Sequence, residues 1–365
     1  MQILVYGISN QKGGISEFMM NLNKNMLKKD ILFNYIIKGK DSVYAPLINE
    51  MNGKVFYYNY KNKIERLTNL YKIMKKERNE TNIFYYNTSG TYFVFPIIFA
   101  KLLRYKIISH AHCGKDRKIN RVLELLNIIN RNLLNIVSSV KFTCSDVAKE
   151  WVYGNAKNVI QVNNAIDQNS FSYDSNLRKK TRKLLGMSMK DIVMINVGRV
   201  EYPKNQKFLI NLMVKLNKLE KKFKLLLVGN GTDLEDLKEY VRNKKINNIY
   251  FLGQRTDINN LLNASDLFLL PSFYEGFPIV SVEAQATGLP CILSNTITKS
   301  SNITNLVRFL PLDAEEEWIN NITNFKIDKR TDMNHILKKK GFDENSICEK
   351  VYDQINKIWE ESYDN

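Results

Sequence analysis

The stretch PSFYEGFP, residues 271–278, decides the fold prediction. It follows the apolar run Leu267–Leu270, which is typical of a buried strand in a parallel sheet. We expect a helix after it, with Pro278 in the first turn and Gly288 just past the end. The stretch is therefore predicted to form a loop at the carboxyl end of a strand, where open α/β sheets bind ligands.

Two glutamates flank the start of this helix. Glu275 lies in the loop, and Glu283 lies about two turns into the helix. A carboxylate accepts paired hydrogen bonds from vicinal hydroxyl groups, so the two could hold a sugar and a ribose. The helix N-terminus would offer free N–H groups to an anion between them. For two carboxylates alone, solvent-facing glutamates on an ordinary βαβ unit are the simpler explanation.

The complete pattern carries more information than the two carboxylates. Glu-Gly-Phe-Pro at 275–278, then Glu283 and Gly288-Leu289-Pro290, resembles the donor-site signature of family four glycosyltransferases. The resemblance implies the GT-B fold, in which two Rossmann-like, doubly wound α/β domains face a central cleft. It also implies a retaining reaction, with Glu275 on the donor sugar and Glu283 on the ribose. Around them, Gly276, Phe277, Pro278 and Ile279 would line the substrate pocket.

The chain length fits two domains. The chain has 365 residues, of which 44% are hydrophobic, so two sizeable cores can form. We expect an N-terminal acceptor-binding domain at 1–167 and a C-terminal nucleotide-sugar domain at 178–344, with residues 168–178 as a polar linker. By the resemblance, a last helix at 345–365 crosses back to the N-terminal domain. Four cysteines without paired spacing and no signal-peptide pattern predict a cytoplasmic protein.

The positive charge is uneven. Of the net +17, residues 1–170 contribute 25 Lys and Arg less 12 Asp and Glu, or +13. This indicates an anionic partner, and we expect the inner face of an anionic membrane. A lysine-rich composition on solvated surfaces would explain the charge equally well. We do not expect nucleic-acid binding, because aromatic and basic residues do not alternate as they do in RNA-binding modules.

The first half alternates apolar runs with helical periods, which predicts βαβ units. A Gly13-Gly14 turn follows the first strand and would either make a tight turn or let the backbone approach a ligand. His110 and His112 follow a later strand and could bond a sugar hydroxyl, or be core histidines bonded to backbone. In the resembled family this strand end contacts the transferred sugar, and we favour His112, with His110 second.

The second half begins after a hinge-like sequence, Val162–Asp167. Arg199 and Lys204 lie on the loop after the strand Ile192–Val197, before a helix, and such cations could bind a diphosphate. Most exposed Lys and Arg residues have no such role. By the resemblance, this pair binds the pyrophosphate, Gly229 lines the nucleotide pocket, and Arg255 lies near the base.

The predicted activity is transfer of a hexose or N-acetylhexosamine from a UDP-sugar. The acceptor would be a glycan or a polyprenyl-diphosphate-linked hydroxyl in capsule or exopolysaccharide synthesis. Catalysis is assigned to His112, Arg199, Lys204 and Glu275. We expect no cofactor and no metal, since the chain lacks an Asp-x-Asp triplet that could clamp a metal diphosphate. The alternatives are a nucleotide-sugar 2-epimerase of the same fold and a non-catalytic partner subunit.

Overall fold

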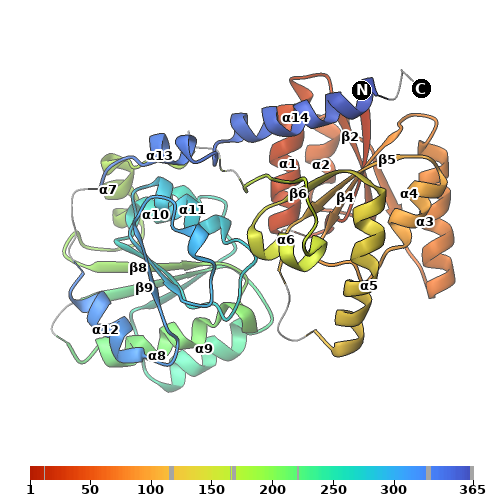
Figure 1. The fold of residues 1–365 in the computed structure, drawn as a ribbon. Coiled ribbons are helices and arrows are strands. Elements are labelled where there is room, and N and C mark those ends of the chain that lie inside the picture. Colours follow the sequence, from red (N-terminus) through yellow and green to blue (C-terminus); the bar gives the residue numbers. More distant parts are fainter. Residues whose placement is uncertain are drawn as a thin grey trace. The chain divides into compact units, whose positions relative to one another are not determined.

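The computed structural model describes residues 1–11, 13–114, 119–164, 166, 170–219, 222–325 and 330–361. The chain forms two compact units, shown in Figure 1. Unit 1 comprises Met1–Ala165 with Glu344–Asn365, and unit 2 comprises Ile166–Asp343. The predicted hinge residues Ala165 and Asp167 lie outside the described residues.

Unit 1 is built on a seven-stranded sheet of order β3-β2-β1-β4-β5-β6-β7, in which all pairs are parallel. Its elements are β1 (Gln2–Tyr6), α1 (Gly14–Leu27), β2 (Leu32–Lys38), α2 (Ala45–Glu50), β3 (Val55–Tyr58), α3 (Lys63–Glu77), β4 (Ile83–Thr88), α4 (Phe95–Leu102), β5 (Lys106–Ala111), α5 (Arg121–Val137), β6 (Ser138–Thr143), α6 (Asp146–Tyr153), β7 (Val159–Gln161) and α14 (Glu344–Glu360).

Unit 2 is built on a six-stranded sheet of order β10-β9-β8-β11-β12-β13, again parallel throughout. Its elements are α7 (Ser175–Leu184), β8 (Ile192–Val197), η1 (Tyr202–Lys204), α8 (Gln206–Leu216), β9 (Phe223–Val228), α9 (Leu234–Asn243), β10 (Ile249–Gly253), α10 (Ile258–Ala264), β11 (Leu267–Leu270), α11 (Ile279–Ala286), β12 (Cys291–Ser294), η2 (Lys299–Ser301), β13 (Val307–Leu310), α12 (Glu315–Thr323) and α13 (Asn334–Lys339).

Both sheets have the same doubly wound order, so the prediction of two Rossmann-like α/β units is confirmed. In each sheet the strand order reverses once. The reversal lies between β1 and β4 in unit 1, and between β8 and β11 in unit 2. The carboxyl ends of strands at such a reversal are where this architecture binds its ligands.

The last helix, α14, belongs to the core of unit 1. Its Ile347, Val351 and Ile355 are buried in one apolar cluster with Phe18 and Met19 of α1. Tight apolar packing of this kind is the main stabilising term for a helix in a folded protein.

The prediction of a linker at 168–178 is wrong at its end, because α7 begins at Ser175. Asp174 caps the helix, accepting hydrogen bonds from the backbone N–H groups of Asn176 and Leu177. The ten residues of α7 are mostly polar, so the sequence has no apolar periodicity that would indicate a helix here. The short helix α2 was not predicted either.

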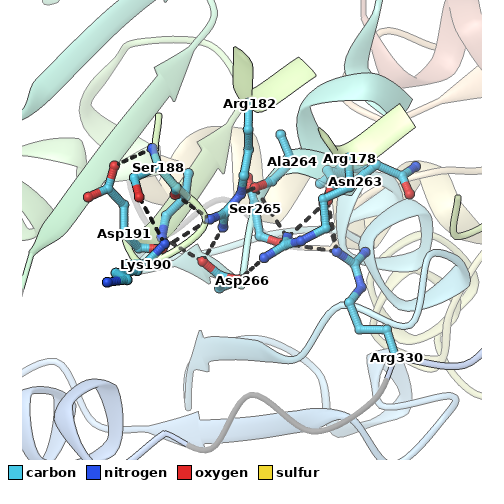
Figure 2. Close-up of polar contacts among 12 residues, drawn as sticks. Arg178, Arg182, Ser188, Lys190, Asp191, Asn263, Ala264, Ser265, Asp266 and Arg330 are labelled. Atoms are coloured by element: carbon cyan, nitrogen blue, oxygen red, sulfur yellow. Dashed lines mark hydrogen bonds and ion pairs between the residues drawn. The ribbon is translucent and has the colours of Figure 1, made fainter. Parts of the chain in front are cut away.

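Buried charges hold α7 against the rest of unit 2 (Figure 2). The guanidinium groups of Arg178 and Arg182 each lie 2.5 Å from a different oxygen of Asp266, just before β11. The side chains of Arg182 and Asp266 are each 1% exposed. Arg330 reaches the same region and donates to the Ser265 carbonyl at 3.0 Å. This network lies at the amino ends of the strands, opposite the predicted site, so we assign it to folding.

Candidate functional site

The predicted site residues of unit 2 gather where its strand order reverses. The loop after β8 carries Lys204, and the loop after the neighbouring strand β11 carries Glu275. The Nζ atom of Lys204 lies 2.7 Å from Oε1 of Glu275. Their side chains are 19% and 11% exposed, so the pair is shielded but open to a ligand. A cation and a carboxylate therefore sit together at the ligand-binding edge of the sheet.

A serine orients the glutamate. Ser272 Oγ donates to Glu275 Oε1 at 2.6 Å. The carbonyl of Ser272 accepts hydrogen bonds from Ser294 Oγ at 2.5 Å and from Thr296 Oγ1 at 2.9 Å. Both contacts that the structure gives for Glu275 meet at Oε1, which leaves the second oxygen of the carboxylate for hydroxyl groups of a ligand.

Three further contacts join the two loops. Asn205 Nδ2 donates to the Pro271 carbonyl at 3.1 Å, and the Phe273 N–H donates to the Pro203 carbonyl at 2.9 Å. The rings of Tyr202 and Phe273 stack with their centroids 5.0 Å apart. The loops are thus positioned by backbone contacts as well as by the ion pair, so the position of Lys204 does not depend on Glu275 alone.

Gly229, at the end of β9, is required by the fold. Its φ is +140°, and an added Cβ would lie 1.9 Å from the Gly198 carbonyl oxygen. Only glycine therefore allows the ends of β9 and β8 to approach this closely. The predicted nucleotide contact of Gly229 stays a prediction, and its effect here is to place the loop that carries Arg199 and Lys204.

The two predicted arginines are more exposed. The Arg199 side chain is 70% exposed and pairs with Glu201 at 3.0 Å. Arg255 follows β10 and donates to both oxygens of Asp257, each at 2.8 Å. The hydrogen bond from Arg255 lowers the pKa of Asp257. Sequence reasoning did not foresee the partners Glu201 and Asp257, although both are near neighbours in the chain.

The glutamate of α11 is half-buried. Glu283 lies between the buried residues Val282 and Ala284. The helix starts one residue after Pro278, which is its N-cap, and Gly288 follows its end with a φ of +64°. The neighbouring residues of the predicted pocket are Gly276, Phe277, Pro278 and Ile279, of which Phe277 is 8% exposed and stacks on Phe342 at 5.6 Å.

The two histidines of unit 1 lie together at the end of β5. Their ring centroids are 4.0 Å apart, and Phe18 of α1 presents a T-shaped contact to each ring. His110 is fully buried, with Nδ1 2.9 Å from the Tyr85 hydroxyl. His112 is 5% exposed, with Nε2 2.7 Å from Asn87 Oδ1. The greater burial of His110 favours His112 as the one that could meet a ligand.

The hydrogen bonds of Asn87 fix the tautomer of His112. Asn87 Nδ2 donates to the Tyr6 carbonyl at 3.1 Å, so its Oδ1 must accept from His112 Nε2–H. The Nδ1 atom of His112 then carries a lone pair. Burial lowers the pKa of His112 to about 3 and holds the pKa of His110 well below its ordinary value. Both rings are therefore neutral at physiological pH.

The structure does not support a tight turn at Gly13. Its φ of −174° is extended backbone, and an added Cβ would meet nothing within 4 Å. Gly13 and Gly14 lead directly into α1, so the fold itself does not require glycine at position 13. The other explanation, that the backbone at Gly13 approaches a ligand, stays a prediction.

Sequence reasoning missed a group at the carboxyl ends of β1, β2 and β3, which we call the tyrosine cluster. Its residues are Tyr6, Lys38, Tyr58, Tyr60 and Arg66. The hydroxyl groups of Tyr6 and Tyr58 are 3.2 Å apart, and Lys38 Nζ lies 5.0 Å above the ring of Tyr60. A hydrogen bond from Lys38 lowers the pKa of Tyr60. The observed strands β1, β2 and β3 end in Tyr6, Lys38 and Tyr58, so polar residues at the ends of the apolar runs could have indicated the cluster.

The described residues form neither a metal site nor a membrane-spanning helix. Over the described ranges, no three His, Cys, Asp or Glu residues are grouped so that they could hold a metal ion. Likewise, no helix in the described part of the chain is both long and apolar enough to cross a membrane.

Sequence comparisons show similarity to glycosyltransferases. Residues 178–341 match the model of the family Glycosyl transferases group 1. The putative glycosyltransferase EpsF of Bacillus subtilis is 25% identical over 91% of this chain and 90% of its own length. The UDP-Gal:alpha-D-GlcNAc-diphosphoundecaprenol alpha-1,3-galactosyltransferase of Escherichia coli is 29% identical over 64% of this chain and 62% of its own.

Structural comparison extends over nearly the whole chain. The crystal structure of Anabaena HepE in complex with UDP matches with a TM-score of 0.82 and 19% identity, covering 98% of this chain and all of HepE. A glycosyltransferase from Rickettsia africae matches with a TM-score of 0.77 and 17% identity, covering 98% of both chains. These likenesses concern the fold.

Proposed function

Because the chain belongs to the glycosyl transferases of group 1 and has their GT-B fold, we propose that it transfers sugar from a UDP-sugar with retention. The sugar is a hexose or an N-acetylhexosamine, and the acceptor is a glycan or lipid-linked hydroxyl in surface-polysaccharide synthesis. The observation that carries the proposal is the Lys204–Glu275 pair at the strand-order reversal of unit 2. It combines a cation for phosphate with a carboxylate for sugar hydroxyls.

Lys204 and Arg199 would bind the diphosphate. An ammonium group has three N–H donors, so a bond to Glu275 leaves two for phosphate oxygens. The exposed guanidinium of Arg199 lies on the same loop and offers a planar fork for a second contact. The N-terminus of α8 begins right after this loop and adds positive potential. Together these groups would stabilise the charge that builds up on departing UDP.

The two carboxylates would hold the rest of the donor. Glu275 accepts from sugar hydroxyl groups, and Glu283 accepts from the ribose. The name of the E. coli relative gives UDP-galactose as its donor, which supports a uridine diphosphate here. His112 is neutral and would bond a hydroxyl of the transferred sugar through Nδ1, since Asn87 occupies its Nε2–H.

Retention follows from a same-face displacement. The bond from the anomeric carbon to the UDP oxygen breaks, and the acceptor oxygen bonds that carbon on the same face. The acceptor's hydroxyl proton passes to the departing phosphate oxygen, so UDP leaves with the proton. This step needs no carboxylate nucleophile on the opposite face and no general base with a pKa near neutrality. His112 would not fit the role of such a base, because burial lowers its pKa to about 3.

The acceptor would bind unit 1 at the tyrosine cluster. Aromatic faces stack on sugar rings, and Lys38 and Arg66 offer cations to a diphosphate. The E. coli relative is named for a diphosphoundecaprenol acceptor, which supports a polyprenyl-diphosphate-linked substrate. The excess of +13 charges over residues 1–170 would help to bring the enzyme to an anionic membrane carrying such an acceptor.

Ligand-induced stabilisation and product release test the proposal. A thermal-shift panel of UDP-, GDP- and ADP-sugars should show stabilisation by UDP-sugars, because a ligand that binds only the native state raises its stability. The stabilising UDP-sugar should then release UDP when a lipid-diphosphate acceptor is added. Stabilisation by GDP- or ADP-sugars alone would overturn the donor assignment. UDP release without transfer to any acceptor would favour a 2-epimerase or a hydrolase.

A further inference from the structure

Asn87 lies at the carboxyl end of β4, where the strand order of unit 1 reverses. In the sheet, β4 pairs with β1 on one side and with β5 on the other (Figure 1). The side chain of Asn87 is 2% exposed and bonds both neighbours. Its Nδ2 donates to the Tyr6 carbonyl of β1 at 3.1 Å, and its Oδ1 lies 2.7 Å from Nε2 of His112, just after β5. One buried amide therefore joins three strand ends at the ligand-binding edge of the sheet.

The backbone around Asn87 holds these contacts in place. Gly7 follows Tyr6 with a φ of +97°, and a Cβ added to it would lie 2.0 Å from the Asn87 carbonyl oxygen. Only glycine therefore allows the end of β1 to come this close to Asn87. The N–H of His112 donates to the Thr88 carbonyl at 3.0 Å, which fixes the histidine backbone beside β4.

A buried asparagine usually serves the backbone and neighbouring amides. Asn34 of β2 is such a residue, because its Nδ2 donates to Gln2 Oε1 at 2.9 Å and its Oδ1 accepts from the Lys54 N–H at 3.0 Å. Asn87 differs from Asn34 because its Oδ1 is directed at an imidazole ring. Among the described residues, the structure gives Nδ1 of His112 no hydrogen-bond partner, so Asn87 controls the one side-chain bond of this histidine.

We propose that Asn87 is a positioning residue for sugar transfer and that, through His112, it selects the donor sugar. By holding the proton on Nε2, Asn87 leaves Nδ1 of His112 as an acceptor only. An acceptor bonds a hydroxyl group that donates, and it gains nothing from a sugar in which that hydroxyl is missing or methylated. The inference rests on the proposed function in one respect, namely that a hydroxyl group of the transferred sugar meets Nδ1 of His112.

The opposite tautomer would remove this selectivity. With its proton on Nδ1, His112 would donate to any hydroxyl or ether oxygen, and a blocked hydroxyl would be accepted as well as a free one. The amide of Asn87 does not permit this tautomer. If the amide turned over, Oδ1 would face the Tyr6 carbonyl oxygen and the hydrogen bond from Nδ2 would be lost in a buried site.

NMR of the full chain with isotopically labelled histidine tests the tautomer. The chain has three histidines, and the His112 signals are those that the variant His112→Gln lacks. In wild type, Nδ1 of His112 should be unprotonated and the Nε2 proton should exchange slowly with water. Neither signal should change between about pH 6 and pH 8, because burial keeps the ring neutral. A proton on Nδ1 of the wild-type ring would overturn the proposal without any variant.

Two substitutions of Asn87 test its control of the histidine. Asn87→Leu has a similar shape but no acceptor, so the Nε2 proton should exchange freely. Asn87→Asp places a carboxylate beside the ring, which favours the charged form, so the pKa of His112 should rise. The other titratable groups beside His112 are the His110 ring on β5 and the Cys144 thiol on β6, and α1 presents the uncharged Phe18. Neither substitution alters these groups.

Asn34 supplies matched controls. Asn34→Leu and Asn34→Asp change another asparagine of the same sheet that is also 2% exposed, and they alter the charge equally. Both control variants should keep the wild-type signals of His112. His112 signals that change equally in the Asn34 and Asn87 variants would show a general effect on the sheet and would overturn the role of Asn87.

UDP-sugars that each lack one hydroxyl group test the selection. For at least one of them, wild-type kcat/KM should fall about tenfold or more, as expected for a lost hydrogen bond. With that analogue, Asn87→Leu should show little further loss, whereas Asn34→Leu should lose as much as wild type. Equal discrimination by wild type and Asn87→Leu with every analogue would overturn the proposal.

Activity of the wild type separates this inference from the proposed function. Sugar transfer with unaltered donor kinetics in Asn87→Leu would overturn the role of Asn87 and leave the proposed function in place. If wild type transfers no sugar although its His112 signals are as expected, the proposed function fails, and the role of Asn87 in that reaction fails with it.

Discussion

Lys204 and Glu275 form an ion pair of 2.7 Å between two loops that are adjacent only because β8 and β11 are neighbours in the sheet. Asn205, Pro203 and Tyr202 join the same two loops independently of that pair. Removing the lysine charge should therefore affect ligand binding much more than folding.

Lys204→Ala should lower kcat about a hundredfold, which corresponds to roughly 3 kcal/mol for a contact to developing charge. Arg199→Ala should act in the same direction. The unfolding free energy of either variant should change by less than about 1 kcal/mol, because the pairs are at least partly exposed. Steady-state kinetics and urea unfolding measure the two quantities. The matched control is Lys179→Ala, which changes an exposed lysine on α7. Near-normal turnover in the Lys204 and Arg199 variants would refute their role in binding phosphate.

The buried network of Arg178, Arg182 and Asp266 lies at the amino ends of the unit 2 strands, and its loss should affect folding much more than ligand binding. Asp266→Asn leaves Arg178 and Arg182 without their charge partner, and breaking a buried pair in this way costs about 3–5 kcal/mol. Asp257→Asn, which breaks the exposed pair with Arg255, should cost under about 1 kcal/mol. Chemical unfolding of the two variants makes the comparison. Equal stability of both would show that the network contributes little.

The buried His112 predicts a pH dependence of stability. Its pKa is lowered to about 3 in the folded chain, whereas an unfolded histidine titrates near 6.5. The contribution of the neutral His112 to the free energy of unfolding is therefore fully present above about pH 6.5. It is lost as the pH falls toward 3, because only the unfolded chain takes up the proton. The loss is about 1.4 kcal/mol per pH unit for this histidine.

Unfolding of wild type and His112→Gln at pH 7.5 and 5.5 isolates this contribution, since the carboxylates are common to both. Wild type should lose more stability between the two values. An identical loss in the variant would contradict the neutral, buried state assigned to His112.

Sugar transfer should not depend on a divalent metal. The chain has no Asp-x-Asp triplet, and Lys204, Arg199 and the start of α8 are assigned the charge of the diphosphate instead. Turnover measured after dialysis against EDTA should equal that of untreated enzyme. Activity that is abolished by EDTA and restored by manganese would show that the diphosphate needs a metal.

The sheet strands were predictable because they are apolar runs with sharp ends. The predicted strands Ile192–Val197 and Leu267–Leu270 coincide with β8 and β11. Parallel strands covered on both faces have this composition. Helix α7 was missed because buried arginines hold it, and a search for apolar periodicity does not detect such residues.

The site was predictable only in part. Resemblance indicated Lys204 and Glu275, yet their pairing joins residues 71 positions apart and depends on strand order. The hydrogen bond between His112 and Asn87 similarly depends on the pairing of β4 with β5.

The most direct test of the account is the proton NMR spectrum of the reaction with an α-linked UDP-sugar of gluco or galacto configuration. The predicted spectrum shows released UDP together with a new anomeric proton whose coupling to the neighbouring ring proton is small, as expected for an α-linked product. A large axial–axial coupling would mean a β-linkage, and would contradict the same-face displacement assigned to Lys204, Arg199 and the departing diphosphate.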